Sequence, residues 1–166
     1  MHREPILIVD DNPMNLKLIR MLLVGGGYQV QTAADAETAE ALLRTWRPSL
    51  ILMDIQLPGI DGLELTRRLK NDPATRGIVI LALTAFAMKG DEERALAAGC
   101  YGYIAKPIDT RALPGIVADY LTTNHLLFLP SYLNEHASIP KQNLNCNNVT
   151  HSLHWYASAH DKYHYF

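Results

Sequence analysis

A run of four apolar residues, Leu50-Ile51-Leu52-Met53, leads directly into a single carboxylate, Asp54. A continuous apolar run of this length indicates a strand that is buried on both faces, as in a parallel sheet. Asp54 would then stand at the carboxyl end of that strand, where open α/β sheets bind their ligands. The alternative is an Asp54 that only caps the next helix. We favour a binding or reactive role because other strand ends carry groups that suit the same site.

The same alternation of apolar runs and helical segments continues along the chain. Strands are expected over residues 6–9, 28–33, 50–53, 78–83 and 101–105. Helical spacing follows each strand, over residues 13–24, 36–47, 62–71, 88–98 and 110–121. Alternation of this kind indicates a parallel sheet with helices on both faces. The predicted fold class is therefore α/β, a doubly wound (βα)5 sheet of five parallel strands.

Two helices carry further expectations. The first is expected to begin at Pro13, with Asn12 as its N-cap, and to end at the glycines of residues 25–27. Its buried stripe is expected to consist of Met14, Leu18, Met21 and Leu22. The last helix is expected to be capped by Asp109 and to run through Leu121, with Pro114 bending it or delaying its onset.

Composition changes near residue 122 and predicts two parts. All ten glycines lie before this point, and six of the seven histidines lie after it. We expect residues 1–122 to form one domain and residues 123–166 to form an irregular C-terminal appendage. Histidine pairs in the appendage have metal-ligand spacing, at residues 151 and 154 and at residues 160 and 164. Without a helical pattern or a third ligand, a metal site there is disfavoured.

Charge and cysteine content narrow the possible roles. The formal net charge of −2 gives no electrostatic reason to expect binding to nucleic acid or to an acidic membrane. Cys100 and Cys146 form no disulfide framework, which favours a cytoplasmic location. We expect no signal peptide and no membrane-spanning segment.

Polar residues stand at the carboxyl ends of four of the five predicted strands. They are Asp10, Asp11, Asp54, Thr84 and Lys106. Carboxylates gathered in one site repel each other by roughly 4 kcal/mol per pair at about 4 Å and an effective dielectric constant near 20. Oxygen ligands without histidine or cysteine favour a hard cation, and we expect Mg²⁺. Lys106 supplies a second positive charge.

This set of groups suits phosphoryl transfer to a carboxylate. An ionised aspartate can act as the nucleophile and form an acyl phosphate. The cation and the lysine would neutralise charge on the transferred oxygens. The sequence shows no serine–histidine–aspartate arrangement, no cysteine–histidine pair and no glycine-rich phosphate loop after a strand.

Residues 4–121 resemble the receiver domain of a two-component response regulator of the CheY-like kind. The resemblance rests on the acidic pair after the first strand and on three segments, residues 53–62 (MDIQLPGIDG), 82–85 (ALTA) and 102–107 (GYIAKP). It implies a flavodoxin-like fold with strand order 2-1-3-4-5. The peptide bond at the position of Lys106–Pro107 is often cis in that family, and the resemblance implies the same here.

The resemblance implies a role for each site residue. Asp54 would be the phosphoacceptor, and Thr84 and Lys106 would contact the phosphoryl group. Ligands for Mg²⁺ would be Asp10, Asp11, Asp54 and the backbone carbonyl of Gln56. Phosphorylation would draw Thr84 inward and turn the ring of Tyr103 into the vacated space. Two positions would tune the lifetime of the phosphoryl group, Gln56 and Phe86, and the bulk of Phe86 predicts slow self-dephosphorylation.

The expected function is that of a phosphoacceptor in a two-component phosphorelay, a signalling role rather than an enzymatic one. Expected partners are a histidine kinase or histidine phosphotransfer protein and a downstream protein target. An apolar rim around Asp54 would suit docking on a helical bundle: Met14, Asn15, Lys17, Pro107 and Ile108. Met14 as an ordinary core residue is an equal alternative.

Two further alternatives concern the origin and the chemistry of the chain. One is a receiver cut from a hybrid histidine kinase, with no independent role. A metal-dependent phosphatase with an aspartate nucleophile is disfavoured, because such enzymes carry a second acid two residues after the nucleophile and Gln56 occupies that position.

Overall fold

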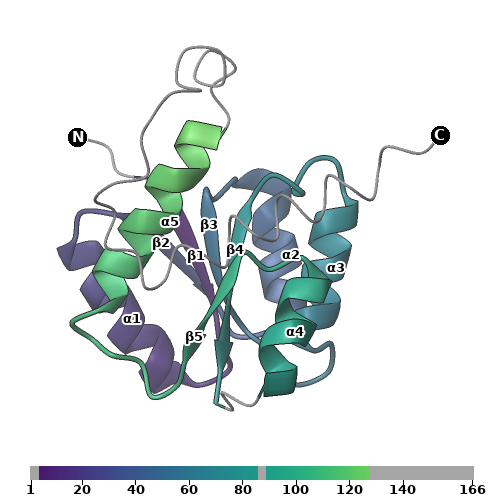
Figure 1. Ribbon diagram of the computed structural model, residues 1–166, viewed down its shortest axis with the longest axis horizontal. Helices are drawn as coiled ribbons and strands as arrows, with labels where there is room; N and C mark the ends of the chain where they lie inside the picture. The colour runs from purple at the N-terminus through teal and green to yellow at the C-terminus, as the bar shows by residue number, and fades with distance from the viewer. Residues whose placement is uncertain (1–3, 86–88, 128–166) are drawn as a thin grey trace, which may run out of the picture. The chain divides into compact units, whose positions relative to one another are not determined.

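Strands and helices alternate along the part of the chain that the computed structural model describes, residues 4–85 and 89–127 (Figure 1). The strands are β1 (Pro5–Val9), β2 (Gln29–Ala33), β3 (Leu50–Asp54), β4 (Val79–Thr84) and β5 (Gly102–Ala105). The helices are α1 (Pro13–Gly25), α2 (Ala36–Thr45), α3 (Gly62–Asn71), α4 (Lys89–Ala98) and α5 (Leu113–Leu127). Phe86, the four tail histidines at 151, 154, 160 and 164, and most of the expected appendage lie outside these residues.

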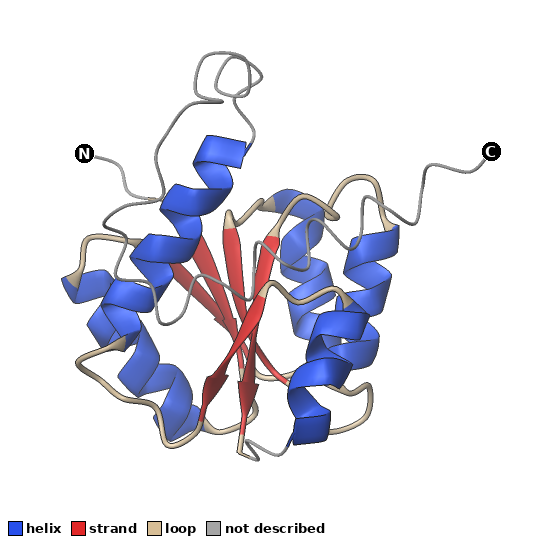
Figure 2. Cartoon of the chain, in the orientation of Figure 1, coloured by secondary structure: helices blue, strands red, loops and turns tan. Residues whose placement is uncertain are grey.

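The five strands form one parallel sheet in the order β2-β1-β3-β4-β5. Helices α1 and α5 cover one face, and α2, α3 and α4 cover the other (Figures 1 and 2). This arrangement confirms the predicted α/β class and the strand order. None of the described helices combines the length and the apolar character that crossing a bilayer requires.

Each face of the sheet packs a separate apolar cluster, because successive strand residues point to opposite faces. Ile6, Ile8, Leu50 and Leu52 belong to the cluster under α1 and α5. Leu7, Val9, Ile51 and Met53 belong to the cluster under α2, α3 and α4. Burial on both sides explains why β3 and β4 are apolar at every position before their last residue.

Short side chains begin three of the helices, and Asn12 is the predicted cap among them. Asn12 accepts a hydrogen bond from the backbone N–H of Met14 at the start of α1, where Pro13 is the first helical residue. Asp35 and Asp61 cap α2 and α3 in the same manner. Such caps depend on neighbours in sequence, so local pattern suffices to find them.

The last helix begins later and ends later than its core pattern suggested. Asp109 accepts hydrogen bonds from the backbone N–H groups of Arg111 and Ala112, which form a turn before the helix. Pro114 is the second residue of α5, a position where its missing N–H costs no helical hydrogen bond. The helix runs past Leu121 to Leu127.

The predicted buried stripe of α1 is wrong for three of its four residues. Met14 is 70% exposed, Met21 is 63% exposed and Leu18 is also exposed, whereas Leu22 packs against the core in part. The helix instead buries Ile19 and Leu23, with Leu16 partly buried. Both series have helical spacing, so periodicity alone does not choose between them. Asn15 lies on the same face, one and two turns before the two buried residues, and its side chain reaches Asp10.

Candidate functional site

The carboxyl ends of the parallel strands bring the predicted site residues together. Asp10 directly follows β1, Asp54 ends β3, Thr84 ends β4 and Lys106 directly follows β5. The register pairs Val9 with Met53, Asp54 with Leu83 and Thr84 with Ala105, so these ends lie at one edge of the sheet. The central position of β1 and β3 buries both acids, because helices cover the two faces.

Lys106 bridges two carboxylates. Its Nζ lies 2.6 Å from Oδ2 of Asp54 and 2.9 Å from Oδ2 of Asp10. Both acids are almost completely buried, and the Lys106 side chain is 18% exposed. A buried charge is tolerated when it is paired in this way. The lysine therefore ties the end of β5 to the ends of β1 and β3.

The pKa of Lys106 reflects opposing influences. Burial by itself lowers the pKa of an amine, since the charged form loses hydration. Hydrogen bonds and charge from Asp10 and Asp54 more than offset burial and raise the pKa of Lys106 above its ordinary value. Lys106 is therefore a fixed positive charge at physiological pH, next to the carboxylate that we predicted to be the nucleophile.

Hydrogen bonds from neighbouring residues orient the two buried acids. Oδ1 of Asp10 accepts the backbone N–H of Asn12 at 2.8 Å. The side-chain amide of Asn15 donates to Oδ1 of Asp10 at 3.2 Å and to Oδ2 at 3.1 Å. Oδ1 of Asp54 accepts the backbone N–H of Gln56 at 2.9 Å. Each carboxylate is thus held through both of its oxygens.

The acidic cluster has the composition of a site for a hard cation. Asp10, Asp11 and Asp54 each offer a carboxylate oxygen, and these oxygens all lie within 4.8 Å of one another. Asp11 is exposed, whereas Asp10 and Asp54 are buried, so the cluster opens to solvent on the side of Asp11. All-oxygen donor sets of this kind suit Mg²⁺, which retains several water ligands.

Other predicted residues lie where their strands place them. Thr84 is buried at the end of β4, and its carbonyl accepts the backbone N–H of Lys106 at 2.7 Å. Gln56 is exposed in the segment after β3. The peptide bond between Lys106 and Pro107 is cis, as the resemblance implied.

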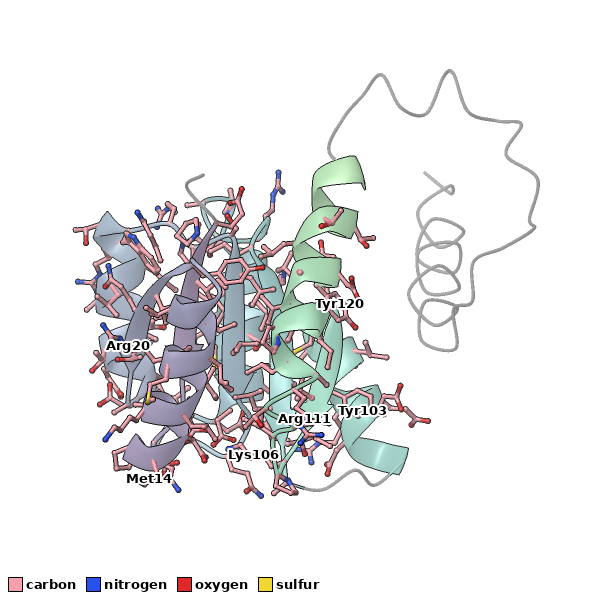
Figure 3. The ribbon with its side chains drawn as sticks, turned by 90° about the vertical axis from the view of Figure 1, so that its left-hand side faces the viewer. Met14, Arg20, Tyr103, Lys106, Arg111 and Tyr120 are labelled. Carbon is pink, nitrogen blue, oxygen red and sulfur yellow. The ribbon has the colours of Figure 1, made fainter. Side chains whose placement is uncertain are left out.

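Tyr103 points outward from β5, with 38% of its surface exposed (Figure 3). Burial of the hydroxyl, together with the negative charge of Glu92 and a hydrogen bond that the hydroxyl donates to it, raises the pKa of Tyr103. Burial raises the pKa of the Tyr120 hydroxyl on α5, and the nearby charges of Tyr103 and Glu92 raise it further. Sequence inspection missed Glu92 and Tyr120, because only packing of α4 and α5 on β5 brings them to Tyr103.

The predicted apolar rim is partly present. Met14 lies at the same end of the molecule as Lys106 (Figure 3) and is strongly exposed. Pro107 is exposed and Lys17 is exposed, whereas Ile108 is half-buried. Exposure of Met14 excludes the alternative in which it is a core residue. Asn15 is directed at Asp10 rather than at solvent.

Comparisons with known proteins agree with this geometry. The response regulator receiver domain family model matches residues 6–118. The polar-differentiation response regulator DivK of Brucella anthropi is 47% identical over 118 residues, which make up 71% of this chain and 96% of DivK.

Solved structures show the same fold. A putative response regulator from Chloroflexus aurantiacus has a TM-score of 0.69 and 34% identity, covering 72% of this chain and 98% of that one. The receiver domain of the sensor histidine kinase PA1611 from Pseudomonas aeruginosa has a TM-score of 0.66 and 38% identity, covering 72% and 98%. That receiver has a magnesium ion coordinated in its active site cleft.

Proposed function

Because this chain belongs to the family of response regulator receiver domains, which are phosphoacceptors of two-component signalling, we propose that Asp54 is the residue that takes the phosphoryl group. The observation that supports this assignment most strongly is the contact between Asp54 and Lys106. Asp54 is the acid at the end of the central strand β3, and the lysine that directly follows β5 holds one of its oxygens at 2.6 Å.

In the proposed reaction the phosphoryl donor is a phosphohistidine of a partner protein. An oxygen of the ionised Asp54 carboxylate attacks phosphorus, and the bond between phosphorus and the imidazole nitrogen of that histidine breaks. The leaving imidazole departs with the bonding electron pair. Lys106 would pair with an oxygen of the transferred phosphoryl group, because its Nζ already contacts Oδ2 of Asp54. The backbone N–H of Gln56 keeps the carboxylate oriented through Oδ1. Thr84, at the end of the neighbouring strand, would donate a hydrogen bond from its hydroxyl to the phosphoryl group.

Residues Asp10, Asp11 and Asp54, with the backbone carbonyl of Gln56, would hold Mg²⁺. When bound, the ion would neutralise charge on the carboxylates and on the phosphoryl oxygens. The close approach of the three carboxylates supports this assignment, because their mutual repulsion favours binding of a cation beside Lys106.

A switch at Tyr103 would follow phosphorylation. In the structure the ring of Tyr103 points outward, and its hydroxyl is hydrogen-bonded to Glu92. Movement of Thr84 toward the phosphoryl group would vacate space behind β5, into which the ring turns at the cost of that hydrogen bond. The surface of α4, β5 and α5 would then change, and a downstream protein would bind there. A ring of Tyr103 that keeps the same NMR chemical shifts after phosphorylation would exclude this switch.

The phosphoryl donor would be a histidine kinase or a histidine phosphotransfer protein. The exposed apolar face of α1 supports docking of a helical bundle, because Met14, Leu18 and Met21 form a stripe that starts beside the site. Similar proteins include both a response regulator and the receiver of a sensor kinase, so the site chemistry suits either origin of the chain. Phosphatase activity is not favoured, since Gln56 occupies the position of the second acid. Cytoplasmic location stays a prediction.

The test is incubation with acetyl phosphate and Mg²⁺, followed by intact-mass measurement. We expect the parent to gain the mass of one phosphoryl group and Asp54→Asn to gain none. Chelation of Mg²⁺ should prevent the gain in the parent. An Asp54→Asn protein that is modified as fast as the parent would refute the assignment. Release of phosphate from a generic ester well beyond one equivalent would support a phosphatase instead.

A further inference from the structure

The side chain of Asn15 reaches the most buried acid of the site. Asp10 is completely buried, and the Asn15 amide contacts both of its carboxylate oxygens, at 3.2 and 3.1 Å. We propose that Asn15 is a positioning residue, whose amide holds the Asp10 carboxylate in the orientation that ion binding requires. This inference rests on the proposed role of Asp10 in the Mg²⁺ site.

The start of α1 places Asn15 on Asp10. The backbone N–H of Asp10 donates to the carbonyl of Ala33 at 3.1 Å, which fixes the acid at the end of β1. Asn12 then begins the helix, and Asn15 follows one turn later on the face that also buries Ile19. The amide therefore turns back toward the strand end from the first turn of the helix. Because cap and strand end are both fixed, the amide needs little rearrangement to make this contact.

The donors on Asp10 differ in whether they are shared. Lys106 divides its ammonium group between Asp10 and Asp54, whereas the Asn15 amide and the backbone N–H of Asn12 contact Asp10 alone among the described residues. If the Lys106 ammonium group moves to contact a phosphoryl group on Asp54, its ion pair with Asp10 weakens. A buried carboxylate without donors is strongly unfavourable. Asn15 would then keep Asp10 satisfied in the phosphorylated protein.

An amide has the right charge for this position. A second cation at residue 15 would compete with the metal ion for the carboxylates, and an acid would add to their repulsion. Asn15 donates hydrogen bonds without changing the charge of the site. Partners that orient metal ligands in this way typically contribute 10- to 100-fold to metal affinity, so a substantial effect on binding is expected.

The experiment measures Mg²⁺ binding without any phosphoryl donor, by isothermal titration calorimetry on the full chain. Asn15→Leu keeps a similar size but removes both donor hydrogens. Asn15→Asp keeps the shape and replaces the donor by an acceptor. Asn71→Leu, at an exposed position at the end of α3, makes the same chemical change away from the site and is the matched control.

We expect Asn15→Leu to bind Mg²⁺ about tenfold more weakly than the parent, and Asn71→Leu to bind as the parent does. Asn15→Asp should unfold at a lower temperature than the parent in the absence of Mg²⁺, and added Mg²⁺ should raise its unfolding temperature by more, because the ion offsets the new repulsion. A purely structural role of the Asn15 shape would leave Asn15→Asp like the parent in both respects.

Two results would overturn the proposal. One is Mg²⁺ affinity of a folded Asn15→Leu within about twofold of the parent, which is far less than loss of an orienting partner produces. The other applies even if Asn15→Leu does not fold. It is an Asn15→Asp protein whose unfolding temperature without Mg²⁺ equals that of the parent. Failure of the parent itself to bind Mg²⁺ would instead refute the proposed metal site, so the two failures are distinguishable.

Discussion

Gly62 lies against the backbone of the strand that carries Asp54. A Cβ atom at this position would lie 1.9 Å from the carbonyl oxygen of Asp54, a distance that no side-chain adjustment relieves. The absence of a side chain therefore allows α3 to start directly beside β3. We infer that the close approach of helix and strand, rather than backbone conformation, requires glycine here.

We predict that Gly62→Ala lowers the free energy of unfolding by about 3 kcal/mol or more, because helix and strand must separate. Urea denaturation measures this loss. Gly90→Ala in α4 is the control, since a Cβ there would meet no described atom within 4 Å, and it should be neutral or stabilising by up to about 1 kcal/mol. Equal stability of the two variants would contradict the packing argument.

Cys100 carries a buried thiol whose titration affects stability at alkaline pH. Burial raises the pKa of the Cys100 thiol to about 11 from the ordinary 9.0, although a hydrogen bond with Thr66 and the charge of Lys70 act in the other direction. Between these pH values the unfolded chain has lost a proton that the folded protein keeps. The free energy of unfolding should therefore fall as pH rises from about 9 to about 11, by roughly 2 kcal/mol from this group.

Comparison of the parent with Cys100→Ala isolates the effect of the thiol. Burial also lowers the pKa of Lys70 to about 8, which makes stability rise with pH from about 8 to 10.5 and so opposes the effect of the thiol in part. Chemical denaturation at pH 8, 9.5 and 11 gives the slope for each protein. The variant should lose less stability than the parent over this range, and parallel slopes would show that the thiol does not contribute.

At the scale of single elements, α1 separates a stability face from an exposed face. Ile19 and Leu23 are buried under the helix, whereas Met14 and Met21 project into solvent. We expect Ile19→Ala to lower the free energy of unfolding by about 2–4 kcal/mol through loss of buried area and a residual cavity. Met21→Ala should change it by less than about 0.5 kcal/mol. Thermal denaturation distinguishes them, and similar losses would mean that α1 packs by the other stripe.

The exposed face of α1 should matter for transfer instead of stability. Met14→Glu is expected to leave the unfolding temperature and phosphorylation by acetyl phosphate unchanged, and to slow transfer from a phosphohistidine protein. The reason is that a charge on the exposed stripe must be desolvated when a helical bundle covers it. Unchanged transfer kinetics from the protein donor would remove α1 from the docking surface.

At the scale of the whole molecule, the sheet and both apolar clusters are built from residues before 128. The cluster members range from Ile6 to Leu121, and the closing helix α5 ends at Leu127. The family match likewise covers residues 6–118. We propose that this part is the receiver domain and that residues beyond α5 form the appendage, with the boundary a few residues later than the expected residue 122.

A shortened chain tests this division. We predict that a protein ending at Phe128 unfolds at nearly the same temperature as the full chain and accepts a phosphoryl group from acetyl phosphate at a similar rate. The full chain measured in parallel is the control. A large loss of either property would show that residues 129–166 contribute to the receiver itself.

The sequence alone sufficed for what depends on near neighbours. Strands β1, β3 and β4 were recognisable because burial on both faces demands apolar runs, and the start of α1 because Asn12 caps it locally. The set of site residues followed from the rule that parallel strands end at one edge, which needs only the position of each polar residue after its strand. Family resemblance supplied the strand order and the expected roles.

Tertiary structure decided everything that depends on how an element is rotated or on what packs across from it. Two apolar series on α1 have the same spacing, and only contact with the sheet and with Asp10 selects the one that is buried. The hydrogen bond between Tyr103 on β5 and Glu92 on α4 likewise connects two elements, and no local sequence pattern predicts that they meet. Periodicity encodes that a helix has an inner face, but the direction of that face is settled by long-range packing, because side chains distant in sequence must fill the same space.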